Sequence, residues 1–210
     1  MKKKIRNENV VIDFFYTGFT WPSHEVVFVI DTSDKHFDTS KELADVLKFA
    51  KSFLKTFKLE SDEQKTQITI IQKNGDDVIT LLKSSDTLPS LEYILSSKNF
   101  GKIGKTVGFS PGYQQVAKTA LNTLLSTQTQ TPKKTVIFFT KDGKLVAPIE
   151  DSFTAADVVM VPVVVGDKKT MKDGKDGLTE SESVIVESVK MLPGVYGTLE
   201  TVIKERHGNL

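Results

Sequence analysis

Three long apolar runs limit the folds open to this 210-residue chain more than any other feature. They cover Val26–Ile30, Thr135–Thr140 and Val158–Val165. Strands that are apolar on both faces are typical of a parallel sheet with helices packed on either side. Pro162 lies within the third run and cannot donate a hydrogen bond to a neighbouring strand. We therefore expect this strand near an edge of the sheet, or with a bulge at the proline.

The segments between and after these runs predict helices and one hairpin. Apolar residues recur every three or four positions from Glu42 to Phe57, which indicates an amphipathic helix. Two β-rich segments flank Asn74-Gly75, a strong cue for an antiparallel hairpin. The other predicted elements are strands at Gln67–Ile71, Val78–Leu82 and Val195–Tyr196, and helices at Leu88–Leu95, Gln114–Leu125, Asp151–Ala156, Glu182–Met191 and Thr198–Lys204.

This order of elements predicts an α/β fold. We expect a Rossmann-like, doubly wound, mostly parallel sheet of six strands, with one antiparallel edge strand and helices on both faces. Residues 1–25 are predicted to form an N-terminal extension, and residues 26–207 a single domain.

Composition excludes several classes of function. Lys and Arg total 28 against 27 Asp and Glu, so the net charge of +1 predicts no bulk attraction to nucleic acid or to an anionic membrane. The chain has no cysteine and three histidines. Cysteine nucleophiles, iron–sulfur clusters and cysteine-bound zinc are therefore excluded, and any metal ion is expected to be held by oxygen atoms.

Neither a membrane span nor a signal peptide is predicted. No apolar stretch is long enough to cross a bilayer. The N-terminus begins with lysines, as signal peptides do, but the apolar run Val10–Ile12 that follows is stopped by Asp13. That run is shorter than the apolar region of a secretory signal.

Oxygen-bearing side chains are expected to meet at the carboxyl ends of the central strands. Asp31 and Ser33 directly follow the first apolar run. Ser110 precedes the helix predicted at Gln114–Leu125, and Asp142 follows the second run. In an open α/β sheet, ligands bind at this edge, where the strand order reverses. If the strands formed by the first two runs are neighbours in the sheet, the carboxylate and hydroxyl oxygens that follow them would suit Mg²⁺.

These features together resemble the von Willebrand factor type A domain, the module of matrix proteins and integrin I-domains. The similarity covers about Val26 to Lys204, nearly the whole chain. It includes the strand that opens onto Asp-x-Ser, the helix with Phe49 and Phe53, the strand at Gln67–Gln72, and the apolar strand before Asp142-Gly143. The resemblance implies a metal-ion-dependent adhesion site built from D-x-S-x-S, a threonine and an aspartate. Mg²⁺ held at such a site accepts a carboxylate from the partner protein.

The resemblance also assigns metal-ligand positions in this chain. Asp31 and Ser33 match the first two ligands of D-x-S-x-S. Ser110 stands at the threonine position, where its hydroxyl could still serve as a ligand. Asp142 matches the aspartate if one inserted residue displaces it along the chain.

Two lysines stand where the family has ligands. Lys35 replaces the last serine of D-x-S-x-S, and Lys141 stands where the aspartate is expected. An ammonium group beside Asp31 would repel a divalent ion. We therefore expect a vestigial site in which Lys35 or Lys141 takes the place of the metal, with no cofactor beyond weak binding of Mg²⁺ or Mn²⁺. Alternatively, Asp31 and Ser33 only cap loop amides.

The main hypothesis is a non-enzymatic module for protein–protein interaction or adhesion, which uses the loops at the carboxyl ends of the strands. The partner would be another protein, such as an extracellular matrix or surface protein, and the resemblance favours an extracellular location. The lysines of these loops would attract an acidic partner. Phe37 and Tyr113 are equally expected to contact a partner or to pack beneath the loops. The residues assigned to partner contact are His36, Phe37, Ser110, Pro111, Tyr113 and Lys144.

Two other classes of function stay open. The sequence around Ser110 fits the G-x-S-x-G elbow of serine hydrolases, and Asp151 or Asp157 and then His207 follow in the chain order of hydrolases. The residues before Ser110 lack the buried strand that such an elbow needs. A divalent metal at the strand ends would instead suit phosphate chemistry. The third class is a structural matrix component that assembles through repeated copies of this fold.

Overall fold

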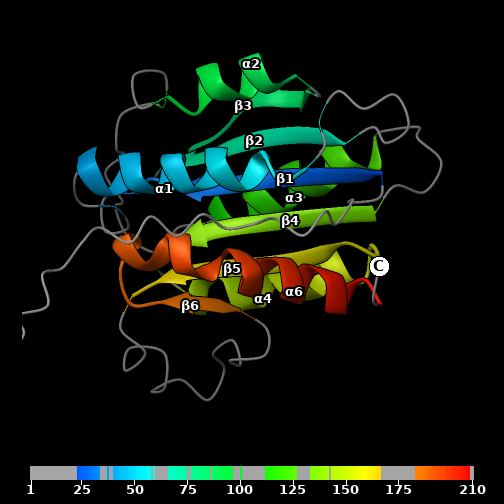
Figure 1. The fold of residues 1–210 in the computed structure, drawn as a ribbon. Coiled ribbons are helices and arrows are strands. Elements are labelled where there is room, and N and C mark those ends of the chain that lie inside the picture. The colour runs from blue at the N-terminus through cyan, green and yellow to red at the C-terminus, as the bar shows by residue number, and fades with distance from the viewer. Residues whose placement is uncertain are drawn as a thin grey trace, which may run out of the picture.

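The structure is a computed structural model, and it places a single sheet at the centre of the molecule (Figure 1). It describes residues 23–33, 37, 40–57, 59, 66–74, 77–85, 87–96, 100, 112–126, 133–141, 143–166 and 183–208.

The sheet has six strands in the order β3-β2-β1-β4-β5-β6. All neighbouring pairs are parallel except the antiparallel pair of β2 and β3, so the predicted fold class is confirmed. The chain runs outward from β1 through β2 and β3 and then returns to β4 on the other side of β1. The strand order therefore reverses between β1 and β4, as a switch point requires. The strands are β1 (His24–Asp31), β2 (Gln67–Asn74), β3 (Asp77–Ser85), β4 (Lys133–Thr140), β5 (Val159–Val165) and β6 (Val184–Val186).

Helices cover both faces of this sheet (Figure 1). Side chains of β1 alternate between the faces, so Val26, Phe28 and Ile30 join one core while Val27 and Val29 join the other. The first core lies beneath α1 (Ser40–Leu54), the 3₁₀ helix η1 (Val189–Val195) and α6 (Tyr196–Arg206). The second lies beneath α3 (Gly112–Leu125) and α4 (Gly143–Thr154). The short helix α2 (Leu88–Ile94) lies beside β3.

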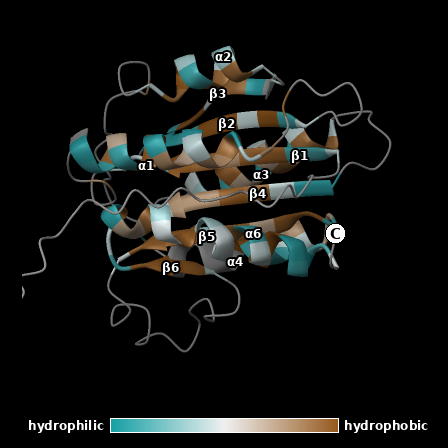
Figure 2. Cartoon of the chain, viewed as in Figure 1, coloured by the Kyte–Doolittle hydropathy of each residue, from teal (hydrophilic) through white to brown (hydrophobic). Residues whose placement is uncertain are grey.

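Aromatic side chains fill the core under α1. Phe28 of β1 stacks on Phe139 of β4 with ring centroids 6.0 Å apart. Phe49 of α1 lies edge-on to Phe139 at 5.8 Å and stacks on Tyr196 of α6 at 4.7 Å. Figure 2 shows strands that are mostly brown, or hydrophobic, and helices in which brown and teal residues alternate. The apolar runs that predicted the strands are therefore buried on both faces.

Two predictions at the edges of the sheet are confirmed. Asn74 lies opposite Asp77 at the end of the antiparallel β2–β3 pair, as the hairpin cue indicated. β5 lies next to the edge strand β6 and pairs with it at Val163–Val165, so Pro162, which is paired with Phe138 of β4, comes one residue before the β5–β6 pairing. A proline near the sheet edge is where this residue is tolerated.

The predictions for the last part of the chain are wrong in part. The helix predicted at Glu182–Met191 is instead β6 followed by η1, and the strand predicted at Val195–Tyr196 is the junction of η1 and α6. Three residues of β6 pair with β5, and their two valines are buried while Ile185 between them is less so. This alternation of period two was too short to separate from a helical pattern. Helix α4 also begins earlier than the predicted Asp151–Ala156.

Over the part of the chain that the structure describes, no helix combines the length and apolarity needed to cross a bilayer.

Candidate functional site

A buried cluster of polar side chains lies at the switch point, on the α3 side of the sheet. Asp31 ends β1, Ser33 follows it, and Lys73 lies beside Asp31 on β2. Tyr113 reaches the cluster from the first turn of α3, and Thr140 from the end of β4. Four segments that are distant in the sequence therefore meet at one point, as the order of the strands predicts.

Asp31 is the centre of the cluster, and hydrogen bonds reach both of its carboxylate oxygens. The backbone N–H of Ser33 donates to Asp31 Oδ1 at 2.9 Å, and the Ser33 hydroxyl donates to the same oxygen at 2.5 Å. The Tyr113 hydroxyl donates to Asp31 Oδ2 at 2.5 Å and lies 3.3 Å from Thr140 Oγ1. Asp31 has 0% of its surface exposed. These hydrogen bonds compensate the carboxylate for the loss of water.

Lys73 brings a positive charge into this buried cluster. Lys73 and Asp31 are directly paired in the register of β1 and β2, so both side chains leave the sheet on the same face. The Lys73 ammonium donates to Ser33 Oγ at 2.8 Å and lies 3.6 Å from Asp31 Oδ2. It also lies 4.6 Å from the centre of the Tyr113 ring, in the position of a cation–π contact. The Lys73 side chain is 1% exposed.

A second set of hydrogen bonds holds the backbone in place behind the cluster. The N–H of Thr32 donates to the Lys73 carbonyl at 2.8 Å, and the Thr32 hydroxyl donates to the same carbonyl at 3.1 Å. The Gln72 amide in turn donates to Thr32 Oγ1 at 2.8 Å. The chain leaving β1 is thus bonded to the end of β2, which fixes Ser33 near Lys73.

The side chains in this cluster do not fit a divalent metal. Ser33 Oγ donates to Asp31, and one of its two lone pairs accepts a hydrogen bond from Lys73, so the ammonium stands beside the hydroxyl where a metal ion would have to approach. The Lys73 ammonium also neutralises the carboxylate that would attract the ion. In the part of the chain that the structure describes, no group of three or more His, Asp or Glu side chains is arranged to hold a metal. Asp31 and Ser33 therefore form a capped turn bonded to Lys73.

Lys141, one of two lysines expected in the place of the metal, lies in a different ion pair. Its ammonium donates to Glu42 Oε2 of α1 at 3.0 Å and lies 5.7 Å from the centre of the Phe37 ring. Both members of this pair are partly exposed. Lys73 rather than Lys141 makes the ion pair with Asp31, which corrects the expectation for Lys141.

Phe37 and Tyr113, which were assigned to partner contact, are both buried. Tyr113 stacks on Phe138 of β4 with ring centroids 5.5 Å apart. Both rings are therefore packed inside the described part of the protein, and their assignment to partner contact stays a prediction. The other residues predicted for the site lie outside the described residues: Lys35, His36, Ser110, Pro111, Asp142 and the side chain of Lys144.

Sequence reasoning missed Lys73, the residue that decides the chemistry of the cluster. A lysine directly after the buried run Gln67–Gln72 was a usable signal, because a lysine at the end of a buried strand needs an acidic partner. Its partner could not be read from the sequence, because the register of β1 against β2 sets which side chains lie side by side.

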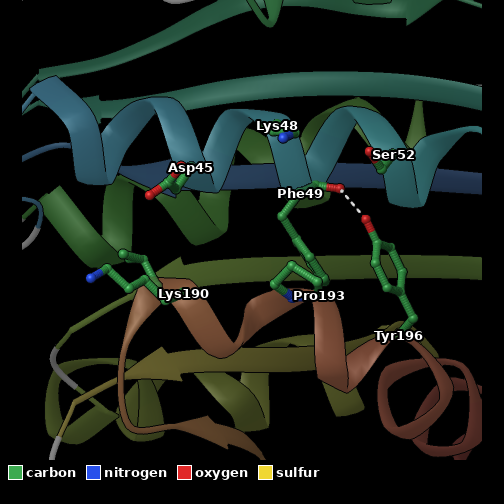
Figure 3. Close-up of a pocket in the computed structure, with 8 residues that line it drawn as sticks. Asp45, Lys48, Phe49, Ser52, Lys190, Pro193 and Tyr196 are labelled. Atoms are coloured by element: carbon green, nitrogen blue, oxygen red, sulfur yellow. Dashed lines mark hydrogen bonds between the residues drawn. The ribbon is translucent and has the colours of Figure 1, made fainter. Parts of the chain in front are cut away.

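A groove of about 460 Å³ lies on the other face of the sheet, between α1 and η1 (Figure 3). Phe49, Pro193 and Tyr196 form its apolar floor, and the Tyr196 hydroxyl donates to the Phe49 carbonyl at 3.4 Å. The remaining lining residues are Asp45, Lys48, Ser52, Val189 and Lys190. The groove is separated from Asp31 by the sheet, because Phe49 belongs to the core under α1 and Asp31 points to the α3 side.

Two histidines meet at the opposite, amino ends of the strands. Thr135 Oγ1 is hydrogen-bonded to His24 Nε2 at 2.7 Å and to His207 Nε2 at 2.8 Å. Burial, with smaller effects of His207 and Lys133, lowers the pKa of His24 from 6.5 to about 3. Burial also lowers the pKa of His207 to about 4. Both imidazoles are therefore neutral at pH 7, and they connect the end of α6 to β1 and β4.

Ser110 of the proposed hydrolase triad lies outside the described residues. His207 lies at the amino ends of the strands, where it contacts Thr135, and the nearby Asp157 acts to raise the His207 pKa against the larger effect of burial. The hydrolase alternative stays a prediction.

Comparison with known proteins finds the same fold in solved structures, although neither a protein-family model nor a curated protein matches the chain. Proximal thread matrix protein 1 from the mussel byssus aligns with a TM-score of 0.67 at 14% identity, over 87% of this chain and 48% of that protein. A structure of the same protein with a zinc-occupied MIDAS motif aligns with a TM-score of 0.61 at 17% identity, over 88% and 46%. The pilus adhesin SpaC of Lactobacillus rhamnosus GG aligns with a TM-score of 0.62 at 9% identity, over 89% and 30%.

At these identities the comparisons show a shared fold. This chain spans about half the length of the matrix protein, with 48% covered, and a smaller part of the adhesin. The α/β fold is thus one that occurs in a thread matrix protein and in a pilus adhesin.

Proposed function

We propose that this chain is a von Willebrand factor type A-like module that binds another protein through the loops at the carboxyl ends of β1 and β4, without catalysis. The observation that carries the proposal is its fold, which is shared along most of the chain with a matrix protein and a pilus adhesin. Ligands of open α/β sheets bind at this same edge. An extracellular location is part of the proposal, on the grounds of the same likeness.

The state of the cluster at that edge supports a role without catalysis. Asp31 has 0% of its surface exposed and is paired with Lys73, so its carboxylate is not available to a substrate as a base or a nucleophile. The histidines His24 and His207 are at the opposite end of the sheet, with lowered pKa values and a shared threonine partner.

Charged side chains lie at the carboxyl-end edge of the sheet, where a partner protein could contact them. Lys141 and Glu42 are partly exposed there, so their ion pair can open and exchange partners at small free-energy cost. In the sequence, Lys35 follows the end of β1 by four residues, and Lys144 is in the first turn of α4, after the end of β4. We propose that the partner is a protein with an acidic surface, because acidic groups would compete with Glu42 for Lys141.

Binding to matrix proteins tests this function. The full chain is immobilised and probed by biolayer interferometry with fibrillar collagen, fibronectin and laminin. We expect at least one protein to bind, Lys141→Glu to weaken binding about tenfold, a loss of about 1.4 kcal/mol, and Lys118→Glu to leave it unchanged. Lys118 is the matched control because it is exposed on the outer side of α3. The proposal would be contradicted if the wild-type chain, Lys141→Glu and Lys118→Glu bound equally well. It would also be contradicted if the chain bound none of the matrix proteins.

A structural role in a matrix is the second candidate, because one of the proteins with this fold is a thread matrix protein. This role requires the chain to associate with copies of itself. Light scattering over a hundredfold range of protein concentration distinguishes the two roles: a constant monomer mass supports the binding module, and growing assemblies support the matrix component.

A further inference from the structure

We propose that the Lys73 ammonium is a tethered cation that takes the place of a divalent metal at the switch point and excludes one from it. The inference concerns the buried cluster alone and does not depend on which partner the module binds. It differs from the sequence-based hypothesis, which placed Lys35 or Lys141 in this role.

The Lys73 ammonium contacts three side chains. Lys73 Nζ lies 2.8 Å from Ser33 Oγ and 3.6 Å from Asp31 Oδ2, and 4.6 Å from the centre of the Tyr113 ring. Asp31 ends β1, Ser33 comes just after it and Tyr113 lies at the start of α3, whereas Lys73 itself belongs to β2. One positive charge thus holds three separate segments together, which is the structural role of a bound metal ion.

Asp31 and Lys73 are a buried pair of opposite charges with no net charge. A divalent ion added to this pair would leave two uncompensated positive charges in a region that water does not reach. Such charges are strongly unfavourable in a buried site, where screening is weak. The cluster therefore repels the ion that its aspartate would otherwise attract.

The buried Lys73 side chain has no alternative position for its charge. An exposed lysine can move its charge into water and make room for a metal. The Lys73 side chain is 1% exposed, and its backbone carbonyl accepts two hydrogen bonds from Thr32. Displacing the ammonium would break its contacts with Ser33, Asp31 and Tyr113 without giving it water in exchange.

If the proposed binding function also holds, partner binding at this edge is independent of divalent cations. This consequence rests on the proposed function. The exclusion of metal does not rest on the proposed function, and it is tested on the chain without any partner. A failure of the metal exclusion can therefore be told apart from a failure of the binding function.

Manganese titration of the full chain is the experiment. Calorimetry of the wild-type protein is expected to show no Mn²⁺ binding, and its melting temperature is expected to be the same in EDTA and in Mn²⁺. Lys73→Ala removes the charge and opens space beside Asp31, so this variant is expected to melt lower and to bind Mn²⁺. At about 100 times the dissociation constant, Mn²⁺ should then raise its melting temperature by about 5–10 °C.

Two control variants separate charge from space. Lys73→Met removes the charge but fills the volume, and it should be destabilised without rescue by Mn²⁺. The double change Asp31→Ala with Lys73→Ala removes the expected ligand and should abolish rescue. Mn²⁺ binding to the wild-type chain that is lost in Asp31→Ala would overturn the proposal, whether or not the Lys73 variants fold. A folded Lys73→Ala variant that does not bind Mn²⁺ would also overturn it.

Discussion

Changing Lys73 to methionine should destabilise the fold by about 3 kcal/mol, and changing Asp31 to asparagine as well should leave the double variant about 1 kcal/mol more stable than the single one. The two side chains form a buried ion pair, with 3.6 Å between Lys73 Nζ and Asp31 Oδ2. Removing one member of a buried pair costs about 3–5 kcal/mol, because it leaves the other charge uncompensated. Removing both charges avoids that penalty.

The contacts of each partner set the magnitude for each variant. Lys73→Met leaves the Asp31 carboxylate with hydrogen bonds from the Ser33 backbone, the Ser33 hydroxyl and the Tyr113 hydroxyl, so we expect a loss near 3 kcal/mol, about the lower limit. Asp31→Asn leaves the Lys73 ammonium with Ser33 Oγ and the Tyr113 ring, so we expect about 5 kcal/mol. The double variant loses only the charge-assisted hydrogen bonds, so its free energy of unfolding should fall by about 2 kcal/mol.

Urea unfolding at pH 7.5, followed by circular dichroism, measures all four free energies of unfolding. The single changes sum to about 8 kcal/mol and the double change is about 2 kcal/mol, so the expected coupling is about 6 kcal/mol. Single effects that add to the double effect within about 0.5 kcal/mol would refute the reasoning, because they would show that Asp31 and Lys73 do not interact in the folded state.

Three further predictions follow from the described contacts. Tyr113→Phe removes the hydroxyl that donates to Asp31 Oδ2 and should lower the free energy of unfolding by about 1.5–3 kcal/mol in urea titrations, whereas a change below 0.5 kcal/mol would contradict this hydrogen bond. Glu42→Gln should change the free energy of unfolding by less than about 1 kcal/mol, because the ion pair of Glu42 and Lys141 is partly exposed. His24 has a pKa of about 3 in the folded state and 6.5 in the unfolded state, so the unfolded state binds the proton more readily and stability falls as the pH drops below 6.5. From pH 7.5 to pH 5, His24 alone should account for a loss of about 2 kcal/mol, which His24→Gln should remove from the pH profile of unfolding.

The central sheet was predictable because its strands are buried on both faces. Val26–Ile30 and Val158–Val165 are apolar without interruption, and only a strand covered by helices on each side needs that composition. The short strand Val184–Val186 was not predictable. Its three residues owe their conformation to pairing with β5 and carry too few positions to show a period.

The candidate site was predictable in its place but not in its chemistry. Asp31 and Ser33 follow a buried strand, so their position at the switch point could be inferred from the order of elements. The cation beside them could not, because Lys73 is 42 positions away from Asp31 and reaches it through the register of β1 and β2. Lys141 is nearer the expected ligand position in sequence, yet Glu42 of α1 pairs with it.

Anomalous diffraction from a crystal soaked in Mn²⁺ tests the central claim most directly. The account predicts no anomalous peak beside Asp31 and clear density for the Lys73 side chain, with its ammonium near Ser33 Oγ and the Tyr113 ring. An anomalous peak at about 2.2 Å from an Asp31 carboxylate oxygen, with Lys73 turned away, would contradict it.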